Sequence, residues 1–233
     1  MRIDILTLFP DMITPVITQS IISRAIYEKK IDIRVINFRE YSENKHQKVD
    51  DSPYGGGAGM VLRVEPIINA LRAIDGYEEA IKIIMTPQGE PYKQSRAEIL
   101  SKANHLIILC GHYEGFDERI RAYFDLEISI GDFVLTGGEI AALTVVDSVI
   151  RLIPGVLNKE ASHEEDSFSE GLLEYPHYTR PREYEGKEVP EILFSGHHAN
   201  IEKWRLEQSI KRTKERRHDL YKSYQKKRKN QDK

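Results

Sequence analysis

The fold of this chain is decided by the stretch from His105 to Gly115, which reads HLIILCGHYEG. After one histidine it begins with a run of Leu, Ile and Cys. That is the composition of a strand buried on both faces, and a glycine-bounded loop follows at once. Four more runs share this character, and stretches with the apolar spacing of a helix separate them. Repeated alternation of strand and helix predicts an α/β fold with a parallel sheet.

The same patterns give the bounds of the predicted elements. The predicted strands are Ile3–Phe9, Ile31–Asn37, Ile81–Thr86, His105–Cys110 and Leu126–Ile130. The predicted helices are Ile13–Lys29, Val64–Ile74, Lys93–Ala103, Asp117–Phe124 and Glu139–Leu152.

The composition changes after the Ile-Pro-Gly sequence at residues 153–155. The segment that follows is acidic and poor in apolar side chains, as flexible linkers are. We therefore expect a first domain at 1–157, a flexible linker at 158–170 and a small helical domain at 171–233. The apolar face of a helix in the last domain is predicted from Ile201, Trp204, Leu206 and Ile210.

Length and composition exclude several classes of protein. The 233 residues are 40% hydrophobic and 30% charged, as in globular rather than disordered or fibrous proteins. The single cysteine, Cys110, excludes an internal disulfide and a zinc site built from several thiolates, and its position predicts a small buried side chain at a strand end. No apolar run reaches the ~18–20 residues that span a bilayer, and the N-terminus reads directly into a strand. We expect a cytoplasmic protein with no membrane partner.

Positive charge is concentrated at the C-terminus. Residues 203–233 contain 13 Lys and Arg against 4 Asp and Glu, a net +9 on a chain of total charge -3, which leaves -12 for the other residues. Basic side chains at this density release counterions from a phosphate backbone, so RNA or DNA is an expected partner. A solvated terminal helix accounts for the same charges equally well.

Four loops concentrate glycine and other turn residues, at residues 50–60, 86–89, 111–119 and 130–139. The last three follow predicted strands, and such loops meet at one edge of a parallel sheet, where ligands bind. Their backbone amides and carbonyls suit an adenine edge and a ribose. Each loop taken alone also agrees with an ordinary tight turn.

The glycine run at residues 55–59 permits positive backbone φ angles and the close approach of another backbone or of a ligand phosphate. No Gly-Lys-Ser/Thr sequence follows it, so it is not a Walker loop, and its spacing is not that of a dinucleotide fingerprint. On its own it is also consistent with a flexible loop.

Glu114, in the third strand-end loop, is expected to point into the resulting pocket. A carboxylate buried there needs a hydrogen-bond donor. Arg119, Arg121 and Arg151 are the candidates, although a local surface ion pair is the usual fate of such residues. The linker carboxylates at 164–166 either close over the site or form a solvated loop. The histidines lack metal-binding spacing, and no metal site is assigned.

The chain carries six motifs in order, DDSPYGGGAGM (50–60), PQG (87–89), GHYEG (111–115), IGDFVLTGGE (130–139), PGVL (154–157) and PHYTRP (176–181). With these motifs the sequence closely resembles the bacterial tRNA (guanine-N(1))-methyltransferases, the TrmD family of the SPOUT class, from Met1 to about Arg217. Ala58, His112 and Phe133 depart from the commoner Pro, Arg and Tyr, which leaves details of cofactor contact open.

The resemblance implies a fold and an activity. Members of this family have an α/β domain with a deep trefoil knot, then a linker and a small helical domain, and they are homodimers whose active site draws on both subunits. They transfer the methyl group of S-adenosylmethionine to N1 of the guanosine immediately 3′ of the tRNA anticodon, which prevents frameshifting. The implied partners are tRNA and a second copy of the chain. A requirement for Mg²⁺ is also implied, and no ligand set for it is evident in the sequence.

The resemblance also assigns residues. Asp166 corresponds to the general base, Arg151 to the catalytic arginine and Glu114 to the carboxylate that holds the target base. The implied cofactor contacts are Thr86, Pro87, Gln88, Gly89, Gly111, Tyr113, Glu114, Gly115, Ile130, Gly131, Phe133, Leu135, Gly137 and Gly138. The expected tRNA contacts are Arg180, Arg182, Lys203 and Arg205 for phosphates, and Ser167, Glu174 and His177 for bases.

These residue types suit the chemistry. N1 of guanine carries a proton at neutral pH and must lose it to become a nucleophile. Free Asp, with a pKa of ~3.9, is a weak base for this proton, so an arginine that stabilises negative charge on the base oxygen has to contribute. Two other classes compete, a non-catalytic RNA-binding module and a nicotinamide dehydrogenase. The set of Glu114, Arg151 and Asp166 argues against the first, and the missing dinucleotide fingerprint argues against the second.

Overall fold

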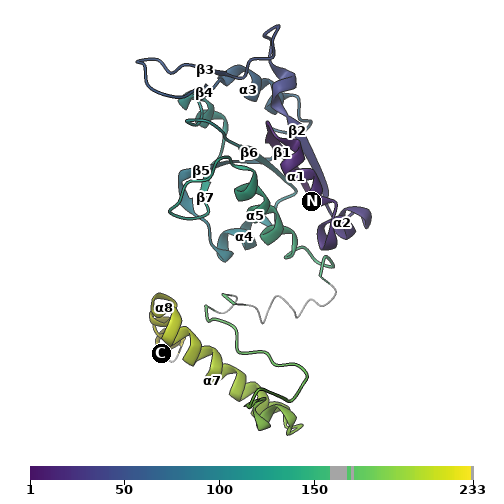
Figure 1. The fold of residues 1–233 in the computed structure, drawn as a ribbon, viewed down its shortest axis with the longest axis vertical. Coiled ribbons are helices and arrows are strands. Elements are labelled where there is room, and N and C mark those ends of the chain that lie inside the picture. The colour runs from purple at the N-terminus through teal and green to yellow at the C-terminus, as the bar shows by residue number, and fades with distance from the viewer. Residues whose placement is uncertain (158–166, 169–170, 232–233) are drawn as a thin grey trace. The chain divides into compact units, whose positions relative to one another are not determined.

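The computed structural model describes residues 1–157, 167–168 and 171–231. The chain forms two compact units, Met1–Asn158 and Lys159–Lys233 (Figure 1). In the described ranges no helix combines the length and the apolar character needed to cross a membrane.

The first unit is built on a five-stranded parallel sheet of order β2-β1-β6-β5-β7 (Figure 1). Its strands are β1 (Arg2–Thr7), β2 (Asp32–Asn37), β5 (Ile81–Pro91), β6 (His105–Cys110) and β7 (Leu126–Ser129). The α/β prediction is confirmed. Because β6, β5 and β7 are neighbours and parallel, the loops that follow them leave the sheet along one edge.

Helices cover both faces of the sheet. They are α1 (Pro10–Ile17), α2 (Ser20–Tyr27), α3 (Val64–Arg72), α4 (Gln94–Leu100) and α5 (Glu139–Ile150), with the 3₁₀ helices η1 (Phe38–Tyr41) and η2 (Glu118–Tyr123). Alternate residues of β6 serve the two cores: Leu106 and Ile108 pack with α1, α2, α4 and α5, and Ile107 and Leu109 pack with α3, η1 and η2. Successive residues of β6 point to opposite faces of the sheet, and those from Leu106 to Cys110 are all apolar because helices cover both faces.

Two predicted helices differ from those in the structure. A single helix over Ile13–Lys29 is wrong, because α1 ends where the Thr18 amide and hydroxyl both bond to the Thr14 carbonyl, and Ser20 then takes a φ of +54°. The predicted helix Asp117–Phe124 is a 3₁₀ helix instead. The Asp117 carboxylate accepts from the Arg119 amide at 3.0 Å and closes a tighter turn.

Strand β5 is longer than predicted, and its register with β7 shifts between Met85 and Glu90. Gly89 lies in this irregular part. A Cβ on Gly89 would approach the carbonyl carbon of Glu127 to 2.5 Å, so only glycine allows the two backbones to come this close.

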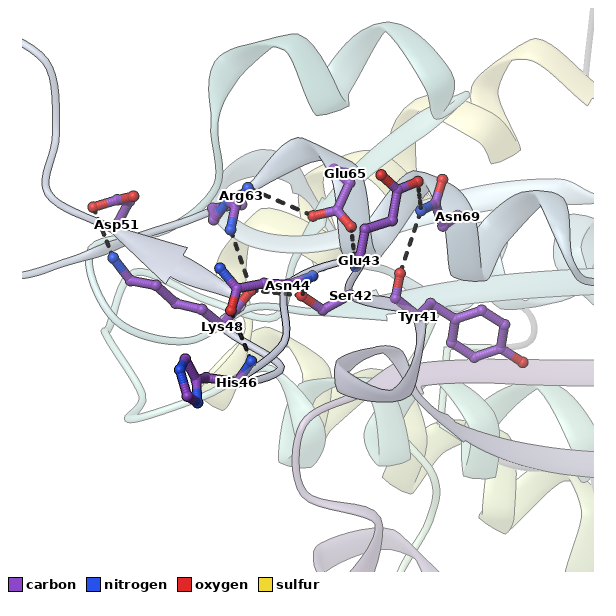
Figure 2. Close-up of polar contacts among 10 residues, drawn as sticks. All are labelled: Tyr41, Ser42, Glu43, Asn44, His46, Lys48, Asp51, Arg63, Glu65 and Asn69. Atoms are coloured by element: carbon purple, nitrogen blue, oxygen red, sulfur yellow. Dashed lines mark hydrogen bonds and ion pairs between the residues drawn. The ribbon is translucent and has the colours of Figure 1, made fainter.

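Strands β3 (Asp50–Asp51) and β4 (Val61–Leu62) form a short hairpin that carries the glycine run, and we call it the glycine hairpin. It was not predicted from the sequence. Figure 2 shows the polar contacts at its base. The Glu65 carboxylate accepts from the Glu43 amide at 2.5 Å and lies 3.7 Å from the Arg63 guanidinium, and Lys48 lies 3.1 Å from Asp51. These contacts join the segment before the hairpin to the start of α3.

The second unit contains β8 (Glu183–Tyr184), β9 (Lys187–Glu188), η3 (Glu191–Phe194), α7 (His198–Arg216) and α8 (His218–Gln231). Leu206 of the predicted apolar face is 46% exposed, so that part of the prediction is wrong. The face that packs instead includes Ser209 and Thr213, both buried. The Thr213 hydroxyl accepts from the Leu173 amide and donates to the Ser209 carbonyl, which satisfies these polar groups inside the unit.

Candidate active site

A cavity of about 500 Å³ lies where β5, β6 and β7 end. Its walls come from three loops, at residues 86–88, 111–116 and 130–138. Every residue that the family resemblance assigns to the cofactor lines this cavity except Gly89, whose backbone packs against β7 instead. The prediction that loops after neighbouring strands form one pocket is confirmed. The contacts with a cofactor remain a prediction.

Two of these loops cross at Gly138. A Cβ on this residue would lie 2.8 Å from both the Cα of Cys110 and the amide nitrogen of Gly111. Glycine is required there for space, because the approaching atoms are backbone and have no rotamer to change.

The glycine hairpin is bonded to the loop after β6. The Glu114 amide donates to the Met60 carbonyl at 3.0 Å, and the Leu62 amide donates to the Gly115 carbonyl at 2.9 Å. Gly59, at φ +85°, leaves room for the Glu114 side chain, since a Cβ would lie 2.5 Å from Glu114 Oε1. The predicted positive φ angles are therefore present, and the group that approaches closely is a side chain.

Glu114 lines the cavity as expected, but it is exposed and does not need a buried donor. Two of its candidate partners are bound elsewhere. Arg119 lies 2.7 Å from Asp117, and its side-chain hydrogen bond lowers the pKa of that carboxyl. Arg121 donates hydrogen bonds to Glu127, Glu118 and Gln88. The bond to Glu127 raises the pKa of the Arg121 guanidinium. The contact with Gln88 fixes one wall of the cavity.

Sequence reasoning missed a polar network behind the cavity. The buried carboxylate of Glu139 accepts from the Thr7 hydroxyl at 2.6 Å and lies 2.8 Å from Nε2 of His112. Burial, with a smaller contribution from Glu139, raises the pKa of the Cys110 thiol well above its usual value. The prediction of a small buried Cys110 is confirmed. The nearest signal in the sequence was the Gly-Gly-Glu at the start of a predicted helix, which does not identify His112 or Thr7 as partners of Glu139.

Two of the three predicted catalytic residues, Glu114 and Arg151, lie on different elements of the first unit. Arg151 caps the C-terminus of α5, whereas Glu139 at the other end of that helix adjoins the cavity. The twelve residues of α5 span ~18 Å, so the backbone of Arg151 lies about one helix length from that of Glu139. Asp166 lies outside the described residues.

Four of the predicted tRNA contacts gather around Tyr175 in the second unit. The Glu174 amide donates to the Ser167 hydroxyl at 3.0 Å, and His177 Nε2 lies 2.6 Å from the Glu174 carboxylate. The Arg205 guanidinium lies 4.7 Å from the Tyr175 ring centre. The remaining three do not join this group: Arg180 and Lys203 are exposed, and Arg182 pairs with Glu191 and stacks on Phe194.

Within the described parts of the chain, no three His, Cys, Asp or Glu side chains come together as ligands of a metal ion. The Mg²⁺ that the resemblance implies finds no ligand set among these residues, and no chemical step is assigned to it.

Comparison with known proteins identifies the family. The family model "tRNA (Guanine-1)-methyltransferase TrmD" matches residues 1–223. A Brevibacillus brevis protein named tRNA (guanine-N(1)-)-methyltransferase is 58% identical over 94% of this chain and 91% of its own length. A Staphylococcus aureus protein of the same name is 56% identical over 96% of this chain and 92% of its own length. This chain therefore belongs to the tRNA (guanine-1)-methyltransferase family, TrmD, as its motifs and its glycine-lined cavity had indicated.

Proposed function

We propose that this chain methylates N1 of the guanosine immediately 3′ of the tRNA anticodon, with S-adenosylmethionine as methyl donor. One observation carries the proposal: the three motif loops form the walls of a single cavity in a chain that matches the family over residues 1–223. The names of the relatives supply the substrate, and the position beside the anticodon follows from the family resemblance.

The cavity suits the proposed donor in size and in chemistry. Its volume of about 500 Å³ lies in the ~300–1,000 Å³ range of small-molecule sites. Glycines 111, 131, 137 and 138 line the cavity without side chains that would fill it, while Ile130 and Leu135 add apolar surface. Bound there, S-adenosylmethionine supplies a methyl group activated by its sulfonium.

The chain's own residues then have to activate the purine. Asp166 accepts the N1 proton, and Arg151, which stays charged, stabilises the negative charge that spreads to the base oxygen. Glu114, exposed at the cavity wall, holds the base edge. Asp166→Ala and Arg151→Ala are expected to bind S-adenosylmethionine like the wild type and to lose at least ~100-fold in methyl transfer. Retained turnover in either variant would remove that residue from the mechanism.

Arg151 follows the last residue of α5, whereas Ala141 near the start of that helix lines the cavity, and this separation supports a site completed by a second copy of the chain. The loop at residues 130–138 and the start of α5 expose apolar side chains, with Phe133 and Ile140 more than half exposed and Val134 83% exposed. A homodimer that covers this surface brings in the missing arginine. Mixing Arg151→Ala chains with Glu114→Ala chains is expected to restore activity in the mixed dimer, whereas a site within one chain would stay inactive.

The second unit and the basic C-terminal segment provide the RNA-binding surface. Lys and Arg side chains hold phosphates, and the group around Tyr175 offers aromatic and polar contacts to unstacked bases. The trefoil knot, the linker at 158–170 and a cytoplasmic location belong to the same proposal.

A further inference from the structure

The most deeply buried acidic side chain beside the cavity has no role in the mechanism above. Glu139 is the first residue of α5 and is 0% exposed. An ionised carboxylate inside a protein is costly unless donors replace its water. Two side chains from distant parts of the chain do this, the Thr7 hydroxyl at 2.6 Å and His112 Nε2 at 2.8 Å.

The three residues join three elements behind the cavity, and His112 also lines it. Thr7 ends β1, His112 follows β6 and Glu139 begins α5. The Thr7 oxygen also accepts from the Phe9 amide at 2.9 Å, and the Phe9 ring lies 4.5 Å from the His112 ring, centre to centre. The imidazole is thus held by a carboxylate at one nitrogen and by an aromatic ring.

Gly137 gives independent support that this pair is built into the cavity. Its φ is not left-handed, so the backbone does not demand glycine. Glycine is favoured here by space, because a Cβ on Gly137 would lie 2.6 Å from Oε2 of Glu139 and would collide with Cε1 of His112. The residue that permits the contact between His112 and Glu139 is itself part of the cavity wall.

We infer that His112, acting through Glu139, is a positioning residue that holds the loop at 111–115 against the loop at 137–138 and so shapes the site for S-adenosylmethionine. An ionised Glu139 only accepts, so the positioning role requires the hydrogen of this contact to be on Nε2 of the imidazole, which ¹⁵N spectra of the histidines test. Losing the donor leaves a buried carboxylate with one partner fewer and releases the link between two walls. The inference rests on the proposed function, because it takes S-adenosylmethionine as the ligand.

Two substitutions separate the donor from the volume of the ring. His112→Leu keeps bulk and removes the donor, while His112→Gln places an amide NH₂ near the position of Nε2. Loss of a hydrogen bond to a charged group predicts that His112→Leu weakens S-adenosylmethionine binding about tenfold in calorimetry. The KM for S-adenosylmethionine rises by the same factor, and kcat at saturation changes less than about threefold. His112→Gln recovers most of the affinity. His46→Leu, an exposed histidine that does not line the cavity, is the matched control and binds like the wild type.

The outcomes are distinct. If His112→Leu binds within about twofold of the wild type, or if His112→Gln is as weak as His112→Leu, the positioning role is wrong. If the wild type itself fails to bind S-adenosylmethionine, the proposed function falls, and this inference with it. Should His112→Leu not fold, ¹⁵N spectra of the wild-type histidines decide. A slowly exchanging hydrogen on Nε2 of His112 supports the role, and a hydrogen on Nδ1 with Nε2 bare overturns it.

Discussion

The amide of Gly138 donates a hydrogen bond of 2.9 Å to the carbonyl oxygen of Gly111, and this bond joins the loop before α5 to the loop after β6. A methyl group at residue 138 would meet the backbone of Cys110 and Gly111 at 2.8 Å. We expect Gly138→Ala to lower the free energy of unfolding by at least ~2 kcal/mol, because overpacking against backbone cannot be relieved by a rotamer change. Urea titration measures this loss.

Gly55→Ala is the control for that substitution. Gly55 has a φ of +86° and no atom near its virtual Cβ, so alanine there brings backbone strain of about 1 kcal/mol without a clash. Equal losses in the two variants would show that close approach at residue 138 is not what demands glycine.

Cys110 is predicted to be unreactive in the folded chain. It is fully buried, and burial raises the pKa of its thiol well above the usual value, so almost no thiolate forms at pH 8. A colorimetric thiol reagent is expected to label one cysteine at once in denaturant and to label the native protein only at the rate of unfolding. Native labelling as fast as in denaturant would show that the strand end is open to solvent.

Asp117 is expected to make a small contribution to stability that depends on pH. The Arg119 side chain lowers its pKa in the folded state, so the contribution is present above the ordinary Asp pKa and is lost as pH falls through the lowered value. Asp117→Asn keeps a side-chain oxygen that accepts from the Arg119 backbone amide. It is predicted to lose ~0.5 kcal/mol at pH 7, and this loss is expected to shrink as pH falls through the lowered pKa, measured as urea midpoints. A difference that grows toward acid would contradict this.

Tyr54, 100% exposed at the tip of the glycine hairpin, is predicted to stack on a base of the bound RNA. Base–aromatic stacking is worth ~1–3 kcal/mol, so Tyr54→Ala should weaken tRNA binding about tenfold and leave S-adenosylmethionine affinity unchanged. Tyr27, 88% exposed on α2, supplies the control, and Tyr27→Ala should bind tRNA normally. A similar loss in both variants, or in neither, would exclude stacking by Tyr54.

The sequence predicted strands better than breaks in helices. His105–Cys110 was predicted to the residue, because a fully apolar run is bounded there by Asn104 and Gly111. The break before Ser20 carries no glycine, and its local signals, Pro15 and the polar run at residues 18–20, are outweighed by the apolar residues that continue on both sides of it. Leu206 was assigned to the wrong face, because Ser209 and Thr213 are buried through hydrogen bonds that a hydrophobic pattern does not register.

The candidate site was predictable as far as it consists of loops after strands. The order β6-β5-β7, which makes those loops neighbours, is set by pairing between distant segments. The contact of His112 with Glu139 could not be predicted from the sequence for the same reason. Each residue alone resembles a polar loop residue, and only the fold buries the carboxylate and brings the imidazole to it.

The central claim is tested most directly by labelled methyl transfer from S-adenosylmethionine to two tRNA transcripts that differ only at the nucleotide immediately 3′ of the anticodon. With guanosine there, the account predicts one labelled methyl group per tRNA, recovered as N1-methylguanosine after nuclease digestion. With adenosine it predicts none. Equal labelling of both transcripts, or a methyl group recovered on any other atom, would contradict it.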